Sequence, residues 1–158
     1  MKVLIALLLL VTASGCKAVA SYPAGTATPL SRGTLIEACT RLEDALKTEL
    51  NCAALPPPMV VVSSIVPAMA GPFEILYGLY FDDEHIIYIS DEMGPEKKAV
   101  VIMHETIHYI LSMVGLSKTI GNCKNEELAH ILSGEPWGDN ERSFYNCDGR
   151  VSESVFTI

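Results

Sequence analysis

The spacing of apolar residues from Pro95 to Val114 predicts a long amphipathic helix. The apolar positions recur every three or four residues and are Val100, Met103, Ile107, Ile110 and Val114. Pro95 suits the first turn of such a helix, and Gly115 suits the position just after its end. His104 and His108 form a second stripe beside the apolar one. We therefore expect a helix whose two histidines stand at the edge of the hydrophobic core.

Apolar stretches in the rest of the chain predict two more helices and three strands. These are helices at Thr34–Leu50 and Glu126–Ser133, and strands at Met59–Ser63, Phe73–Phe81 and His85–Ser90. Lys118–Asn125, by contrast, is polar and is expected to be a loop. Together these elements predict an α+β fold in which a small mixed or antiparallel sheet packs on the central helix.

The first 15 residues have the pattern of an export signal. A positive charge at Lys2 precedes the apolar run Val3–Val11, which is too short to cross a membrane as a helix. Small residues then lead to Cys16, and this ending resembles the lipobox of bacterial lipoproteins, in which the cysteine is lipidated and becomes the new N-terminus. An ordinary secretory signal cut near Gly15 is the alternative.

The lipobox resemblance implies a protein of the bacterial cell envelope that is anchored to a membrane through lipid at Cys16. Lys17 follows the cysteine in place of an aspartate, which implies the outer membrane, with the domain facing the periplasm. The residues up to Arg32 are mostly small and include proline, which is typical of a flexible tether. We therefore expect a signal at 1–15, the lipidated cysteine and tether at 16–32, and one domain at 33–158.

The acidic balance of the chain limits its partners. The net charge is −8 at pH 7, and loss of Lys2 with the signal would make it −9. A charge of this sign argues against nucleic acid as a partner and against attraction to anionic lipid. Membrane contact would then depend on the lipid anchor. The sequence does not fix the oligomeric state.

The central predicted helix carries the motif His104-Glu105-Thr106-Ile107-His108. Residues four positions apart lie on the same face of a helix, so the two imidazoles can bind one metal ion. Glu105 lies next to them and can hold a water molecule for attack on a substrate. The alternative is a buried helix with two hydrogen-bonded core histidines and a surface glutamate.

A catalytic zinc site has three protein ligands and one open position, so the motif needs a further ligand. Asn125-Glu126-Glu127-Leu128-Ala129 can supply it, and with this stretch the chain resembles the gluzincins, the thermolysin-like and aminopeptidase-like zinc peptidases. In the aminopeptidase branch the third ligand lies in a similar stretch, about nineteen residues after the second histidine. The motif assigns the ligand to Glu126, eighteen residues after His108, whereas strict spacing would assign it to Glu127.

The resemblance implies a minimal zincin-like peptidase, because the chain lacks the large second subdomain of thermolysin. It implies Zn²⁺ held by His104, His108 and Glu126, with Glu105 as the general base that activates water against a peptide or protein substrate. His130 stands where thermolysin-like enzymes carry an aspartate. It is either a residue that orients a metal ligand or a surface histidine.

Two questions stay open at the level of the sequence. The residue that stabilises the oxyanion could be Tyr145, Arg142 or His130. The protein could also be a lipid-anchored binding or assembly protein whose zinc site is structural or vestigial. Glu105 argues against that second hypothesis, because a purely structural site has no use for a base.

Four cysteines remain after Cys16, and in an exported chain they predict up to two disulfides. If the first helix runs to Leu50, then Cys39 and Leu50 lie roughly 16 Å apart along its axis. Cys52 follows soon after, so it is not expected to return to the separation from Cys39 that a disulfide needs. We therefore predict bridges from the first helix region to the region of Cys123 and Cys147.

Overall fold

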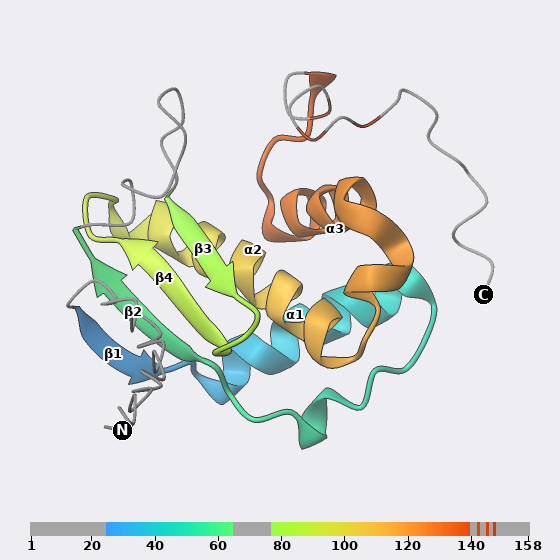
Figure 1. Cartoon of the computed structure of the whole chain (residues 1–158), viewed down its shortest axis with the longest axis horizontal. Helices are drawn as coiled ribbons and strands as arrows, with labels where there is room; N and C mark the ends of the chain where they lie inside the picture. Colours follow the sequence, from blue (N-terminus) through green and yellow to red (C-terminus); the bar gives the residue numbers. More distant parts are fainter. Residues whose placement is uncertain (1–24, 65–76, 140–141, 143–144, 146, 148–158) are drawn as a thin grey trace, which may run out of the picture.

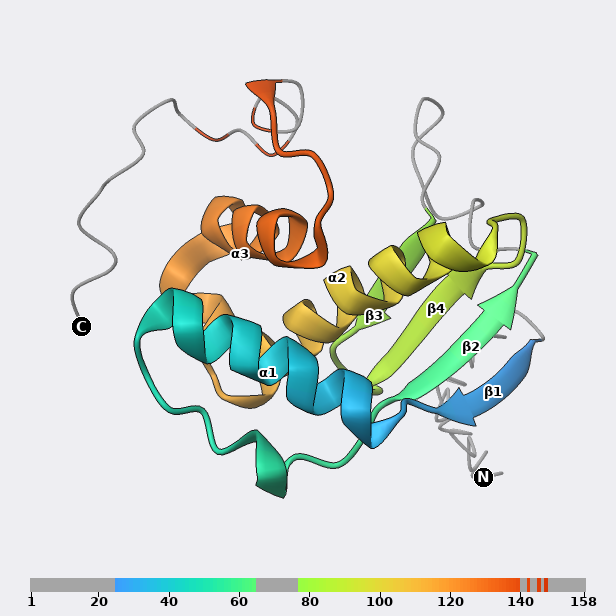
Figure 2. The same ribbon diagram turned by 180° about the vertical axis from the view of Figure 1, so that it is seen from behind.

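The computed structural model describes residues 25–64, 77–139, 142, 145 and 147. These residues form three α-helices and a four-stranded mixed sheet, so the predicted α+β class is confirmed. Helices α1 (Arg32–Leu46) and α2 (Pro95–Met113) lie on the same side of the sheet, and α3 (Ser117–Ser133) packs mainly against α2 (Figures 1 and 2). The part of the chain that the structure describes contains no helix long and apolar enough to cross a membrane.

The sheet has the strand order β1-β2-β4-β3. The strands are β1 (Thr26–Pro29), β2 (Met59–Ser63), β3 (Gly78–Phe81) and β4 (Ile86–Ser90). β2 and β4 are parallel, with Val60 opposite Ile87, whereas the two outer strands pair antiparallel to their neighbours. β3 therefore lies at one edge of the sheet, where it contacts α2.

The strand predictions hold for the central strands and fail at the N-terminal edge. β2 has the predicted bounds, and β4 begins one residue later than predicted, at Ile86. The strand predicted at Phe73–Phe81 is seen as β3 at its end, and residues 65–76 lie outside the described residues. Thr26–Pro29, which the sequence placed in the tether, instead pairs with β2. Its short, exposed sequence lacks the apolar alternation that marks a strand.

The central strands contribute to a core on the helix side of the sheet. Val60, Ile87 and Ile89 belong to one buried cluster with residues of all three helices. Val61 and Tyr88 alternate with them and therefore point to the opposite face, where they form a second cluster. A strand that is buried on both faces reads as a continuous apolar run, as β2 and β4 do.

The helices differ from their predicted bounds mainly at their ends. The first, α1, covers Arg32–Leu46, and the backbone N–H of Thr34 donates to the capping hydroxyl of Ser31 at 3.0 Å. The central helix, α2, covers Pro95–Met113 as predicted. The third, α3, covers Ser117–Ser133 and includes the stretch predicted to be a loop. It is kinked at Gly121, whose φ of 76° only glycine adopts readily.

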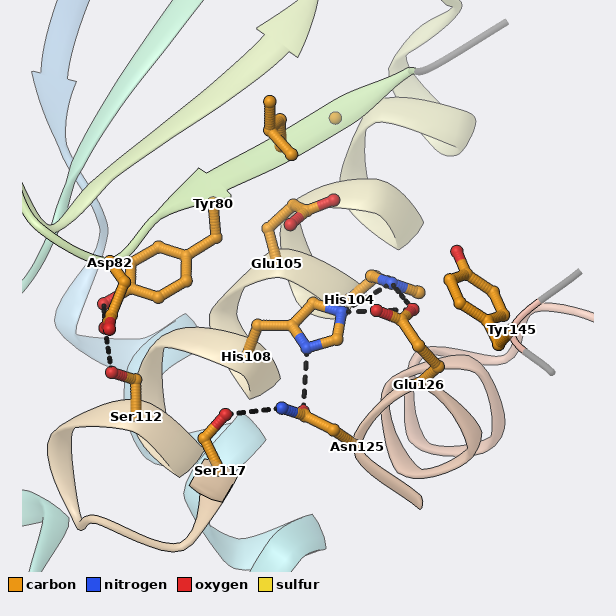
Figure 3. Close-up of a pocket in the computed structure, with 12 residues that line it drawn as sticks. Tyr80, Asp82, His104, Glu105, His108, Ser112, Ser117, Asn125, Glu126 and Tyr145 are labelled. Atoms are coloured by element: carbon orange, nitrogen blue, oxygen red, sulfur yellow. Dashed lines mark hydrogen bonds and ion pairs between the residues drawn. The ribbon is translucent and has the colours of Figure 1, made fainter. Parts of the chain in front are cut away.

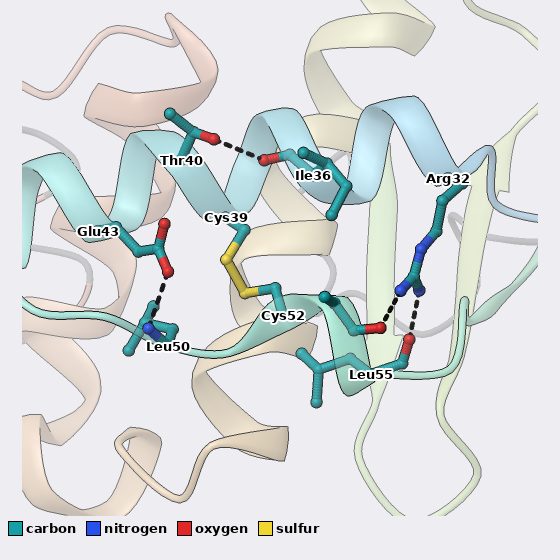
Figure 4. Close-up of a disulfide and its surroundings, with 9 residues drawn as sticks. Arg32, Ile36, Cys39, Thr40, Glu43, Leu50, Cys52 and Leu55 are labelled. Carbon is teal, nitrogen blue, oxygen red and sulfur yellow. Dashed lines mark hydrogen bonds between the residues drawn. A yellow bond between two sulfur atoms is a disulfide. The ribbon is translucent and has the colours of Figure 1, made fainter.

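The structure has two disulfides, as predicted, but the predicted pairing is wrong. The bridges are Cys39–Cys52, shown in Figure 4, and Cys123–Cys147. The error lies in the end of α1: the helix ends at Leu46, four residues before the predicted end at Leu50, because Lys47 adopts the left-handed conformation. The chain then turns back, and the Cα atoms of the first pair come within 6.1 Å. A helix that ends at lysine rather than glycine gives no stop signal in the sequence.

Candidate metal centre

The motif histidines stand side by side on α2, and their Nε2 atoms are 3.0 Å apart. His104 is 8% exposed, and His108 is partly buried. Thr106 and Ile107, on other faces of the same turn, are fully buried and fix the rotation of the helix. The apolar stripe predicted from the sequence therefore sets the direction in which the two imidazoles point.

Glu126 on α3 faces the two histidines. Its Oε2 atom lies 3.6 Å from Nε2 of His104 and 3.5 Å from Nε2 of His108. Tetrahedral coordination with bonds of about 2.0–2.1 Å places ligand atoms about 3.3 Å apart. The triangle of two nitrogens and one oxygen therefore has the dimensions of one face of such a site (Figure 3). Glu127 instead pairs with Lys124 at 2.7 Å and does not line the cleft.

His130 offers a second way to complete a metal site. His104, Glu126 and His130 have ligand atoms that all lie within 4.8 Å of one another, so this group could hold a metal ion. Both sets of three share His104 and Glu126. In the set with His108 the three separations lie between 3.0 and 3.6 Å, close to the spacing of ligand atoms in a tetrahedral site.

Asn125, the residue before Glu126, sets the orientation of His108. Nδ1 of His108 lies 2.9 Å from Oδ1 of Asn125, and the Asn125 amide nitrogen donates to the hydroxyl of Ser117 at 2.6 Å. Because the amide oxygen then faces His108, the Nδ1–H donates to it. This fixes the tautomer that leaves Nε2 with a free lone pair, which a metal ligand requires.

The orientation of His104 depends on Glu135, which the sequence analysis did not identify. The Glu135 carboxylate lies 2.7 Å from Nδ1 of His104 and 3.5 Å from Nδ1 of His130. Neither Nδ1 atom makes a well-formed hydrogen bond within the described residues, although both are buried. Glu135 follows Gly134, which ends α3 with a φ of 88°, and its own N–H donates to the carbonyl of His130. No sequence motif marks a residue in that position.

Glu105 is buried between α2 and the edge strand. It is 7% exposed, and burial raises its pKa while the two histidines act in the opposite direction. Gly78 in β3 makes this approach possible, because a Cβ there would lie 2.4 Å from Val101 and 2.9 Å from the Glu105 carboxylate. The strand and the helix can therefore come this close only at a glycine.

The charges of the site favour a cation. Burial of His104 opposes its charged form, but Glu126 and Glu135 outweigh burial and raise its pKa to about 10. Burial also opposes ionisation of Glu126, but both motif histidines outweigh it and lower the pKa of this carboxyl. The metal-free protein thus holds a proton where the ligand atoms converge, and a bound metal ion would displace it.

These side chains line one cleft of about 290 Å³. The cleft brings together His104, Glu105, His108 and Glu126, the four residues predicted at the site. Tyr145 also lines it, whereas Arg142 and His130, the other proposed oxyanion donors, do not. Cys16, the predicted lipidation site, lies outside the described residues.

Comparisons with protein-family models, with curated proteins and with solved structures find no significant match to this chain. The residues of the cleft are therefore the basis for inferring its function.

Proposed function

We propose that the protein is a zinc-dependent peptidase. The observation that supports this most strongly is the triangle formed by Nε2 of His104, Nε2 of His108 and Oε2 of Glu126, with a buried glutamate beside it. Two imidazoles and one carboxylate are a donor set that suits zinc, and a three-ligand site leaves a position open for chemistry. A purely structural zinc site has four protein ligands.

In this proposal each residue of the cleft has a separate role. His104, His108 and Glu126 hold zinc, which when bound would polarise the scissile carbonyl and lower the pKa of a water molecule. Glu105 accepts the proton of the attacking water and passes it to the leaving amine. Burial raises the pKa of Glu105, and a raised pKa makes its carboxylate a stronger base. Tyr145 lines the same cleft, and in this proposal its hydroxyl donates a hydrogen bond to the oxyanion.

The wider architecture supports a zincin-like fold in a minimal form. A helix that carries both histidines packs beneath an antiparallel edge strand, and a second helix brings the glutamate. We further propose, from the sequence alone, that the protein is exported and anchored by lipid at Cys16. The domain would then act on peptides or proteins at the bacterial outer membrane, on its periplasmic side.

Zinc content and peptide turnover of parent and Glu105→Gln test the proposal. The parent should contain one zinc per chain and cleave members of a peptide library. Glu105→Gln should keep the zinc and the fold but lose activity by about 10²-fold or more, because only the base has been removed. Glu127→Gln is the matched control, since it makes the same change outside the cleft.

The outcome that overturns the proposal is also clear. If the parent holds zinc but cleaves nothing, and Glu105→Gln leaves partner binding and stability unchanged, the protein is a binding or assembly protein. Its zinc site would then be structural or vestigial.

A further inference from the structure

The cleft continues beyond the metal ligands to a polar end. Ser112 follows His108 by four residues on α2, so it lies on the same face about one turn, roughly 5–6 Å, further along. Tyr80 and Asp82 of the β3–β4 hairpin face it across the cleft, at the end away from Tyr145 (Figure 3). If a substrate's scissile bond lies at the metal, the side chain of a residue next to that bond would therefore reach this end of the cleft.

The Asp82 carboxylate is held in place by two hydroxyl groups. Ser112 donates a hydrogen bond to it, and the Tyr80 hydroxyl donates to the same oxygen at 3.2 Å. Tyr80 is itself fixed, because its ring packs edge-on against Tyr109 with centroids 5.8 Å apart. Burial raises the pKa of Tyr80 to about 12, so its hydroxyl keeps its proton and remains a donor at neutral pH.

The charge of Asp82 has no cationic partner within the described residues. Its hydrogen-bond partners are neutral hydroxyls, and the residues that line the cleft include no lysine or arginine. The other two carboxylates of the cleft, Glu105 and Glu126, stand beside the histidines, where a metal ion would offset them. Asp82 is thus the one negative charge of the cleft that the proposed site leaves uncompensated.

Asp82 is exposed at the mouth of the cleft, where a substrate side chain can reach it. We propose that Asp82 is a specificity-determining residue that selects substrates with a lysine or arginine side chain next to the cleaved bond. This inference rests on the proposed peptidase function and names its substrate class. A long basic side chain could lay its apolar stem along the Tyr80 ring and bring its charge to the carboxylate. Neutral side chains of the same length would leave Asp82 without a counter-charge.

Matched peptides test this assignment. They differ only at the residues flanking the cleaved bond, which are lysine, arginine, glutamate or norleucine, an uncharged side chain close to lysine in length. The zinc-loaded parent should show a kcat/KM for the lysine and arginine peptides about tenfold or more above that for norleucine. Asp82→Asn keeps the size and one oxygen that can accept from Ser112 and Tyr80, but it removes the charge, so it should bring this ratio close to one. Asp83→Asn, in the same turn but outside the cleft, should preserve the preference.

Binding to zinc-loaded Glu105→Gln, measured by calorimetry, separates the two proposals. If the parent cleaves nothing but Glu105→Gln binds the lysine peptide through Asp82, the peptidase proposal fails and the cationic subsite stands. If the parent cleaves all the peptides equally, the subsite is wrong and the peptidase proposal stands. If Asp82→Asn slows all peptides by the same factor, Asp82 only joins the hairpin to α2, and the specificity role is refuted.

Discussion

The two helices that form the candidate metal centre are held in the molecule by different means. α2 lies between α3 and the strands, and Ile107, Tyr109 and Ile110 along it are fully buried. α3 packs on α2 at the side of the core, carries a kink at Gly121 and leaves Ile131 56% exposed. The segment after it is joined back to α3 by the Cys123–Cys147 bridge. One half of the site thus lies within the core, whereas the other, the attached half, joins the core along one face of α3 through Leu128 and Ala129.

The difference shows how function is distributed between the halves. The core helix provides the two histidines and Glu105, whose relative positions are fixed by one continuous turn of helix. The attached half provides Glu126, His130 and Glu135, which surround the histidines with negative charge and hydrogen-bonding groups. We expect changes in the attached half to alter metal binding without unfolding the core.

The largest effect should come from the ligand of the attached half. Glu126→Ala should lose zinc almost completely, because it removes one of three protein ligands. The loss should exceed the roughly 10²-fold that removal of a ligand's hydrogen-bond partner can cost. Glu127→Ala should keep its zinc, since Glu127 pairs with Lys124 instead. Metal analysis of the two purified variants decides between them, and the reverse order would assign the ligand to Glu127.

A smaller effect is expected from the carboxylate behind His104. Glu135→Gln removes the charge 2.7 Å from Nδ1 of His104 while keeping the size of the side chain. Zinc affinity, measured by competition with a chelator, should fall by about 10- to 100-fold. Asn125→Ala should have a comparable effect through His108. Glu127→Gln is the control, and equal affinity of Glu135→Gln and the parent would show that His104 needs no such partner.

The core half of the site could be predicted from the sequence, because the residues that form it are close together in the chain and their spacing shows how they lie on the helix. Periodicity identified the bounds of α2, and the four-residue spacing placed His104 and His108 on one face. Glu126 could be placed by its resemblance to a known motif, and the structure brings it to the histidines. The two histidines lie within one element, where helix geometry fixes their relation, whereas the contact of Glu126 with them joins two helices and was predicted only through the motif.

The remaining features depend on tertiary structure and could not be predicted in the same way. Glu135 reaches His104 only because Gly134 turns the chain back over α3. The Cys39–Cys52 pairing depends on the turn at Lys47, a residue without a helix-stop signal. β1 is a strand only because β2 offers it an edge. Such features arise from contacts between segments, and the sequence of either segment alone does not contain them.

The smallest expected difference between the core half and the attached half concerns the two disulfides. Cys39–Cys52 and Cys123–Cys147 span 13 and 24 residues, and loss of either should lower the free energy of unfolding by about 3 kcal/mol. The effects on the site should differ, because only the second bridge encloses Glu126, His130 and Glu135. Replacing both cysteines of one bridge by serine should therefore lower the free energy of unfolding, measured with denaturant, by a similar amount for either bridge. In chelator competition only the variant without Cys123–Cys147 should bind zinc more weakly than the parent. Its loss of zinc affinity should be smaller than that of Glu135→Gln. Equal zinc affinity in both would mean that packing on α2 alone holds the attached half in place.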